Sequence, residues 1–329
     1  MAITSKEIEA IQFYSKKSIP KYPYWYGMKK ALYEMVDLPS WLPASCHLEH
    51  GAVSMFKEGK PNNYILSNPY PVIFLSNKEQ LEHCKTYPVT KPSYVLGSLF
   101  PRYRRFKKIE KSPAANGSLV FTGHSTKSIA VESDWEELIT QFKALPDIYH
   151  PLTVSIYFID YLKGAHLPFL DAGFDVVTAG HISDPNFIDN FYDILSRFNY
   201  VVSTDVGSHL YYAIEMGIPF FIYGTPGSYH SEDKEFKERG KNYKMKDLKE
   251  FDAVNQIFTP TKEEIKAGIK ITEEQKNFVH QSIGTHDALP LQEVREIIQK
   301  HQWKFYAKES LKAPVTLPLK FYREMKAKF

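Results

Sequence analysis

The sequence predicts an α/β fold built on parallel strands, and residues 174–229 carry the prediction. This stretch alternates short apolar runs with helical patterns, in the order strand, helix, strand, helix, strand. The runs FDVVT, NYVVS and IPFFIYG are too short and too apolar to be half-exposed. We therefore expect parallel strands buried on both faces and joined by right-handed helical crossovers.

The two helices of this stretch have recognisable ends. Asp184 followed by Pro185 is typical of a helix N-terminus. Five apolar residues then share one face at helical spacing: Phe187, Ile188, Phe191, Leu195 and Phe198. Gly217 is expected to end the second helix, and Pro219 prevents it from continuing.

Polar side chains follow the strands, and in a parallel sheet they are expected at one edge. This edge is where open α/β sheets bind ligands. The expected set is His181, Thr204, Asp205, Ser208, His209 and Thr225. The loop 203–208 enters its helix with three hydroxyl groups and a glycine, and such a helix start suits a phosphate. The alternative is an ordinary strand-to-helix turn with a serine cap.

These features together resemble a known family. A histidine after one strand, then a helix, then Ser-Thr-Asp-x-x-Ser before a helix and Gly-x-Pro-φ-φ-φ-Tyr (φ apolar) is similar to the donor half of GT-B glycosyltransferases. The resemblance is to bacterial surface-polysaccharide enzymes: CDP-glycerol polymerases, polysialyltransferases and Kdo transferases. It implies a GT-B-like fold of two Rossmann-like domains that face each other across a cleft.

The resemblance also implies roles for single residues. In these families the histidine and the Ser/Thr pair hold the nucleotide phosphate, which implies that role for His181, Ser203, Thr204 and Ser208. A further strand is expected at 119–122. The loop after it adds two candidates for the same donor site, His124 and Ser125.

A candidate for the catalytic base lies in the first half of the chain. A short strand near residues 45–48 runs into Glu49-His50-Gly51, and carboxylate or imidazole at a strand end can take a proton from a sugar hydroxyl. The polysialyltransferase-like enzymes use an acidic residue near a glycine, and the CDP-glycerol enzymes use the histidine of a His-Gly pair. The choice between Glu49 and His50 stays open.

No metal or other cofactor is expected. Cys46, His47 and His50 suggest a metal cluster, but strand alternation sends Cys46 and His47 to opposite faces. The sequence contains no Asp-x-Asp motif, which agrees with a metal-independent enzyme whose nucleotide-sugar is a substrate.

Composition changes along the chain predict its domains. The basic run 99–111 is expected to be a solvated connector, and the small polar residues 113–117 place a boundary near 115. The expected parts are an acceptor-side domain at 1–115, a nucleotide-sugar-binding domain at 116–300 and a basic-aromatic tail at 301–329. The tail suits attachment to an anionic membrane, or a helix packed back across the first domain.

Bulk properties limit the compartment and the partners. Net charge of +3 is too small to imply nucleic acid. Two cysteines without a CxxC motif favour a reducing cytosol, and no stretch approaches the ~20 apolar residues of a spanning helix. A cytoplasmic protein, or one at the inner face of the cytoplasmic membrane, is expected.

The predicted function is glycosyl transfer from a nucleotide-sugar donor to a saccharide or lipid-linked saccharide acceptor, in capsule or lipopolysaccharide assembly. Two alternatives belong to other classes. A sugar-nucleotide epimerase on the same fold would transform its donor without an acceptor. A non-catalytic subunit of a polysaccharide assembly complex would keep the fold as a docking module.

Overall fold

The structure is a computed structural model that describes residues 3–19, 23–49, 68–86, 89–231, 242–243 and 252–312. The chain forms two compact units. The large unit comprises residues 1–19 and 108–279, and the small unit comprises residues 20–107 and 280–329. The chain therefore passes from one unit to the other after residues 19, 107 and 279.

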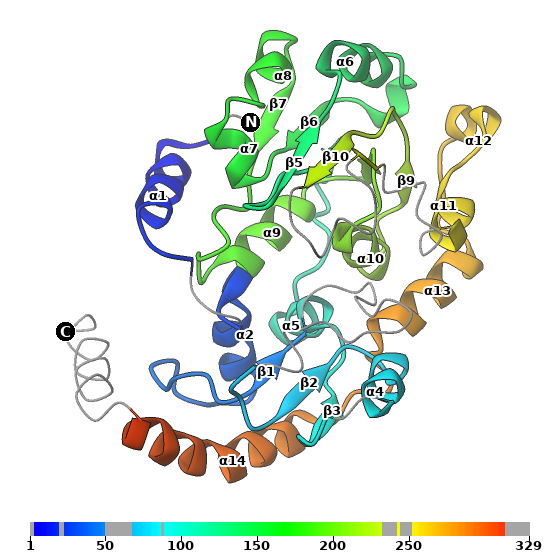
Figure 1. The fold of residues 1–329 in the computed structure, drawn as a ribbon. Helices are drawn as coiled ribbons and strands as arrows, with labels where there is room; N and C mark the ends of the chain where they lie inside the picture. The colour runs from blue at the N-terminus through cyan, green and yellow to red at the C-terminus, as the bar shows by residue number, and fades with distance from the viewer. Residues whose placement is uncertain are drawn as a thin grey trace. The chain divides into compact units, whose positions relative to one another are not determined.

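The large unit is built on a five-stranded parallel sheet (Figure 1). Its strands are β4 (Ser118–Phe121), β6 (Leu152–Ser155), β7 (Asp175–Val177), β8 (Tyr200–Ser203) and β9 (Phe220–Ile222). They lie side by side in the order β7-β6-β4-β8-β9, and every neighbouring pair is parallel. The first strand in sequence is therefore central, and the chain leaves it in one direction and later returns to add strands on the other side.

Helices connect and cover these strands. They are α1 (Ser5–Ser15), α6 (Trp135–Lys143), η2 (Asp147–Tyr149), α7 (Phe158–Leu162), α8 (Leu167–Asp171), α9 (Phe187–Leu195), α10 (Ser208–Glu215), α11 (Asp252–Phe258) and α12 (Lys262–Ala267). α13 (Glu273–Ile283) contains the last passage between the units. A small antiparallel sheet joins β5 (Ile129–Glu132), β10 (Ser228–Ser231) and β11 (Asn242–Tyr243).

The strands of the large unit are buried as expected. Val120, Val154, Val176 and Val202 from four of the strands lie in one apolar core. All five residues of the predicted apolar face are buried. Four of them, Phe187, Ile188, Phe191 and Leu195, lie on α9, whereas Phe198 follows the end of the helix. Gly217 follows α10 with a φ of +79°, a left-handed conformation that ends a helix at little cost for glycine.

The small unit has its own parallel sheet. Three strands, β1 (His47–Leu48), β2 (Ile73–Leu75) and β3 (Ser93–Val95), lie in the order β1-β2-β3. The helical elements of this unit are η1 (Trp25–Gly27), α2 (Met28–Met35), α4 (Lys78–Lys85), α5 (Leu99–Lys107) and α14 (Leu291–Lys312). Figure 1 shows α14 running alongside this sheet. Parallel sheets in both units confirm the α/β class and the two-unit organisation expected of a GT-B-like chain.

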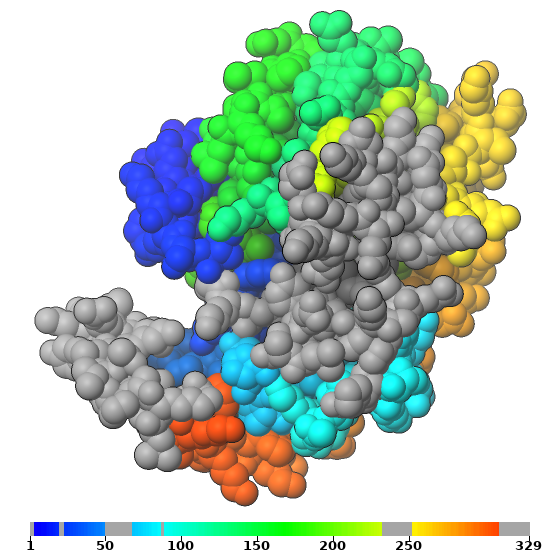
Figure 2. All heavy atoms as spheres, viewed as in Figure 1, coloured from blue at the N-terminus to red at the C-terminus, as the bar shows by residue number. Residues whose placement is uncertain are grey.

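The division of the chain differs from the expected one at both ends. Residues 1–19 belong to the large unit, and Figure 2 shows this blue segment lying against green residues of that unit. Residues 280–312, part of which was assigned to the second domain, belong to the small unit instead. The internal boundary falls at 107–108 and not near 115.

Two local expectations were wrong. The basic run does not begin as a solvated connector, since α5 occupies residues 99–107 of it. Arg102 of α5 donates hydrogen bonds to the carbonyl groups of Leu96 (2.6 Å) and Leu289, and burial lowers the pKa of this arginine to about 10. The Asp184-Pro185 pair does not cap α9 directly. Asp184 accepts a hydrogen bond from the Asn186 N–H (2.8 Å) in a turn before the helix.

Candidate functional site

The strand order of the large unit defines where a ligand is expected. The chain reverses its direction of strand addition between β4 and β8, and crevices form at the carboxyl ends of the two strands at such a point. The loops that follow these strands are residues 122–128 and 204–207. Five of the six predicted donor-site residues lie in these loops or directly next to them: His124, Ser125, Ser203, Thr204 and Ser208.

The two loops are hydrogen-bonded to each other. The Gly123 N–H donates to Oγ1 of Thr204 (3.3 Å), and the Thr204 N–H donates to the carbonyl group of Phe121 (3.1 Å). Oδ2 of Asp205 accepts a hydrogen bond from the Tyr229 hydroxyl at 3.0 Å. Thr204 and Asp205 therefore hold the loops together at the carboxyl edge of the sheet, where sequence reasoning placed them.

The Ser203 hydroxyl is used inside its own loop. It donates to the Asp205 carbonyl (2.7 Å) and accepts from the Asp205 N–H (3.2 Å). It also contacts Nε2 of His209 at 2.9 Å. Because its single hydrogen goes to Asp205, the His209 ring must donate from Nε2. In this structure Ser203 thus supports the loop and His209, with no hydrogen left for a phosphate.

His209 is held from several sides. Its ring stacks on Phe121, with centroids 4.3 Å apart and planes 16° apart. A Cβ atom on Gly207 would lie 2.7 Å from the His209 ring, so this position needs glycine. Burial, and secondly the charge of His124, lower the pKa of His209 to about 3. The imidazole is therefore neutral at physiological pH, with a hydrogen on Nε2 and a lone pair on Nδ1.

The loop after β4 provides one buried and one exposed candidate. Ser125 is buried. Its N–H donates to Oδ2 of Asp160 (2.8 Å), and its hydroxyl accepts from the Val131 N–H (3.2 Å). His124 is exposed as a residue. Its ring centroid lies 4.6 Å from that of Tyr157, and its Nδ1 lies 3.3 Å from the Ser125 carbonyl oxygen. Ser125 therefore shapes the loop, and His124 is available to a ligand at the edge of the sheet.

The start of α10 has the polarity expected of an anion site. Gly207 is the N-cap residue and makes no side-chain capping hydrogen bond, so the ordinary serine cap considered above is not formed. Ser208 is the first helical residue and is half-buried. N–H groups of a first helical turn carry partial positive charge and can bind a phosphate oxygen.

His181 lies apart from these residues. It follows β7, the edge strand, and three inter-strand spacings of about 4.8 Å, about 14 Å in all, separate the ends of β7 and β8. Its ring is 2% exposed and contacts Phe158 (4.0 Å between centroids) and Tyr14 (5.9 Å), while Nδ1 accepts from the Ser183 N–H at 3.0 Å. Burial lowers the pKa of His181 to about 4. The structure therefore brings together Thr204, His124 and the start of α10, and places His181 against α7 and α1.

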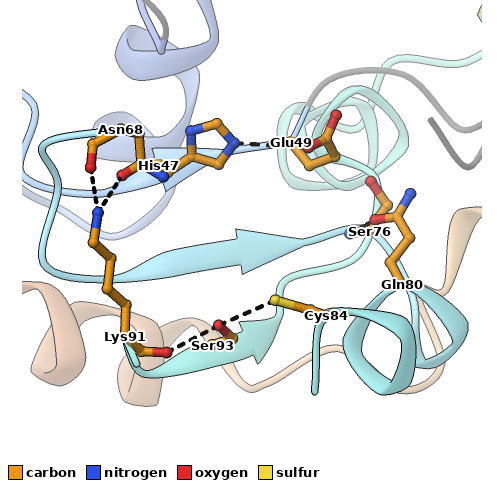
Figure 3. A network of polar contacts seen from close by, with 8 residues as sticks. All are labelled: His47, Glu49, Asn68, Ser76, Gln80, Cys84, Lys91 and Ser93. Carbon is orange, nitrogen blue, oxygen red and sulfur yellow. Dashed lines mark hydrogen bonds and ion pairs between the residues drawn. The ribbon is translucent and has the colours of Figure 1, made fainter. Parts of the chain in front are cut away.

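The small unit places the candidate base beside a histidine. Glu49 follows β1, and its N–H donates to the carbonyl group of Phe74 (3.0 Å). Its Oε2 lies 3.6 Å from Nε2 of His47, and the two side chains are 4% and 1% exposed (Figure 3). His50 lies outside the described residues, so the choice between Glu49 and His50 remains open.

Sequence reasoning missed His47 as a partner of Glu49. The alternation that separates Cys46 from His47 also places His47 and Glu49, two residues apart, on the same face of a strand. The signal was therefore present in the spacing.

Within the described residues, no group of three or more His, Cys, Asp or Glu side chains could hold a metal ion. No helix within the same ranges is long and apolar enough to cross a membrane.

Comparisons with known proteins gave structural matches only. No protein-family model and no curated protein matches the chain. The chain is similar to MnaA of S. aureus, solved with UDP, at a TM-score of 0.42 and 15% identity over 80% of this chain and 68% of MnaA. It is also similar to the wall teichoic acid polymerase TagF, at a TM-score of 0.38 and 12% identity over 79% of this chain and 68% of TagF.

Proposed function

We propose that this protein is a glycosyltransferase of the GT-B type. It transfers a sugar from a nucleotide-activated donor to a saccharide or lipid-linked saccharide acceptor. The proposed setting is the assembly of a bacterial capsule or lipopolysaccharide, in the cytoplasm or at the inner face of the cytoplasmic membrane.

One observation carries the proposal. At the point where the sheet of the large unit reverses its strand order, the loops after β4 and β8 are tied together and an uncapped helix begins. The exposed residue His124 belongs to the same edge. This combination supports binding of a nucleotide phosphate, as the sequence resemblance implies.

The chemistry of the donor site needs no metal ion. A leaving nucleotide develops negative charge on its phosphate as the bond to the sugar breaks. Donors fixed in advance, such as the N–H groups of α10, the hydroxyl of Ser208 and an imidazole, stabilise this charge. The proposed donor residues are His124, Thr204 and Ser208. His181 and Ser203 are retained from the resemblance, and Ser125 is retained as a residue of the loop that carries His124.

Glu49 is the proposed base, and His50 is the alternative. The substitution Glu49→Gln keeps the shape of the side chain and removes its ability to take a proton. We expect kcat to fall about 10²–10⁴-fold while the donor nucleotide still binds. His50→Ala is the matched variant, and near-full turnover in both would place the base elsewhere.

The first test is a thermal-shift panel of CMP, CDP, UDP and GDP with the full chain. A nucleotide that binds only the native state raises the melting temperature, by an amount that grows with its concentration. We expect one nucleotide to stabilise the protein and His124→Ala to reduce that effect. If none stabilises it, the non-catalytic alternative gains and the transferase proposal fails.

The second test separates transfer from epimerisation. The preferred nucleotide-sugar is incubated with the protein in the absence of any acceptor. A transferase leaves the configuration of the sugar unchanged, whereas an epimerase converts it.

A further inference from the structure

The amide group of Gln80 is the unexplained polar group of the small unit. Its side chain is fully buried. Among the described residues, Nε2 of Gln80 has no hydrogen-bond partner. A buried donor without a partner costs about 1–3 kcal/mol of desolvation free energy, so such a group in a native structure calls for a physical reason.

Helix capping accounts for the Oε1 atom of Gln80 but not for its Nε2 atom. Gln80 is the third residue of α4, and its N–H donates to Oδ1 of the N-cap residue Asn77 (2.8 Å). Oε1 of Gln80 in turn accepts from the Ser76 N–H at 2.8 Å. This work requires only an acceptor. Glutamate would do it as well and would also interact favourably with the helix dipole.

The spare amide lies at the same sheet edge as Glu49. The Glu49 N–H donates to Phe74 of β2, which places Glu49 beside the carboxyl end of that strand. Ser76, which holds the Gln80 amide, follows the same end of β2. Figure 3 shows the side chains of Glu49, Ser76 and Gln80 together at this end, with His47 on the far side of Glu49.

A hydroxyl group is the ligand that matches this pair. A carboxylate can only accept a hydrogen bond and an amide N–H can only donate one, whereas a hydroxyl does both. We propose that Gln80 and Glu49 form a subsite for one acceptor hydroxyl, and that His47 is the residue that positions the Glu49 carboxylate. The inference rests on the proposed glycosyl transfer, and it names the contacts of the acceptor.

The transfer step balances with these groups. Nε2–H of Gln80 donates to the hydroxyl oxygen, which turns the hydroxyl proton toward Glu49. The oxygen forms a bond to the anomeric carbon of the donor as the bond from that carbon to the nucleotide phosphate breaks. The proton moves to Glu49, and the nucleotide leaves with the bonding electron pair.

The inference is tested first by binding, without turnover. The full chain is labelled with ¹⁵N, and the side-chain amide signal of Gln80 is identified by its loss in Gln80→Glu, or in Gln80→Met if the first variant does not fold. The probes are methyl β-D-glucopyranoside, methyl β-D-galactopyranoside and N-acetylglucosamine. We expect at least one probe to shift the Gln80 signal in a saturable manner, and no shift with any of them would overturn the subsite.

Gln275 provides a matched control. It holds the same position in α13, where it accepts from the Thr272 N–H (3.1 Å). Its Nε2 is already used, because it donates to the Ile257 carbonyl (3.2 Å). The Gln275 signal should not shift. Equal shifts at both glutamines would indicate unspecific binding and would contradict the inference.

Kinetics then distinguish the roles. Gln80→Glu should raise the acceptor KM about 10-fold, which corresponds to the loss of one hydrogen bond, and should leave the donor KM unchanged. The control variant Gln275→Glu should change neither KM. His47→Gln should lower kcat with both KM values unchanged, and should add no further loss when Glu49 is already glutamine. Additive losses in that double variant would overturn the positioning role of His47.

The two proposals fail in different ways. If a nucleotide stabilises the protein but Gln80 does not respond to saccharides, the transferase function stands and this subsite is wrong. If saccharides shift Gln80 but no nucleotide binds, the hydroxyl subsite stands and the transferase function fails.

Discussion

At the scale of single residues, the burial of His181 makes the stability of the protein depend on pH. Its folded pKa is lowered to about 4 by burial, whereas an unfolded histidine titrates near 6.5. Between these pH values the unfolded chain binds a proton that the folded chain excludes, so stability falls as pH drops from about 6.5 to about 4. Protonation would also remove the acceptor that Nδ1 provides to Ser183.

A variant isolates this contribution. His181→Asn keeps a side-chain acceptor and removes the titrating ring. We expect the free energy of unfolding of the wild type to fall by about 2–3 kcal/mol more than that of the variant between about pH 7 and pH 4.5. Urea unfolding of both proteins at the two pH values measures the difference. His209 is present in both proteins, so its own titration cancels from the comparison. Identical losses would show that His181 is not held neutral by burial.

The phosphate role of His181 is tested separately. The resemblance implies that His181→Ala weakens nucleotide binding without unfolding the protein. Its contacts with Tyr14 and Phe158 give it a second role in packing, so affinity and melting temperature must both be measured. Unchanged nucleotide affinity in a folded variant would remove His181 from the donor site.

Residue-level prediction worked where one rule decided the outcome. The rule that polar residues after parallel strands share one edge placed Thr204 and His124 correctly at the carboxyl ends of β8 and β4. It could not tell that the Ser203 hydroxyl would be used by Asp205 and His209, because those hydrogen bonds depend on how the loop folds back. For the same reason, the sequence could not predict that the Gln80 amide lacks a hydrogen-bond partner among the described residues.

At the scale of elements, the turn into α10 depends on Gly207. A Cβ atom at this position would lie 2.7 Å from the His209 ring, so Gly207→Ala must displace the ring from its stack on Phe121. We expect a loss of about 1–3 kcal/mol in the free energy of unfolding, typical of overpacking. Weaker nucleotide binding should accompany it, since the ring lies at the start of α10.

The clash itself can be verified with a second variant. His209→Ala removes the ring that the new methyl group meets. Gly207→Ala should therefore cost much less stability in the His209→Ala background than in the wild type. Equal costs in the two backgrounds, measured by urea unfolding, would show that the ring is not the obstacle.

Element prediction succeeded where hydrophobic periodicity was strong. The four-residue apolar face of α9 and the glycine end of α10 were both predicted from residue spacing. The basic run at 99–111 was misread because of its many charged residues, although its first part, 99–107, forms α5. Its buried side, with Leu99, Phe100 and Tyr103, is what makes it a helix of the small unit.

At the scale of the whole molecule, the ends of the chain were assigned to the wrong units. Sequence order predicts contiguous domains, but residues 1–19 belong to the large unit and residues 280–312 belong to the small one. These memberships depend on contacts between segments far apart in sequence. An example is the hydrogen bond from the Tyr306 hydroxyl to the Pro43 carbonyl (2.5 Å). No local pattern encodes such a pair.

This assignment changes where the tail must be cut to test membrane attachment. The expected tail began at residue 301, yet α14 continues to Lys312. In α14, Gln302 is buried and the ring of Phe305 contacts Tyr70. Deleting from 301 would remove these contacts and confuse attachment with loss of folding. Deletion of residues 313–329 leaves α14 intact.

The basic and aromatic residues of the tail predict binding to anionic lipid. Residues 313–329 contain four basic side chains and one acidic one: Lys320, Arg323, Lys326, Lys328 and Glu324. Each cation near an anionic surface contributes about 1 kcal/mol, and salt screens the attraction. We expect the full chain to co-sediment with phosphatidylserine vesicles at low salt, and to be released at high salt.

Two variants identify the source of this attachment. The chain without residues 313–329 should remain in the supernatant, and so should a full-length chain with its four basic tail residues changed to glutamine. If the deletion releases the protein but the glutamine variant still sediments, the aromatic residues anchor it and not the charge.

α14 itself exposes Trp303 (66%) and carries Lys300, Lys304 and Lys308 at four-residue spacing. Salt-sensitive sedimentation of the deleted chain would therefore move the attachment surface from the tail to α14. If the full chain stays in the supernatant at low salt, the prediction of membrane attachment fails.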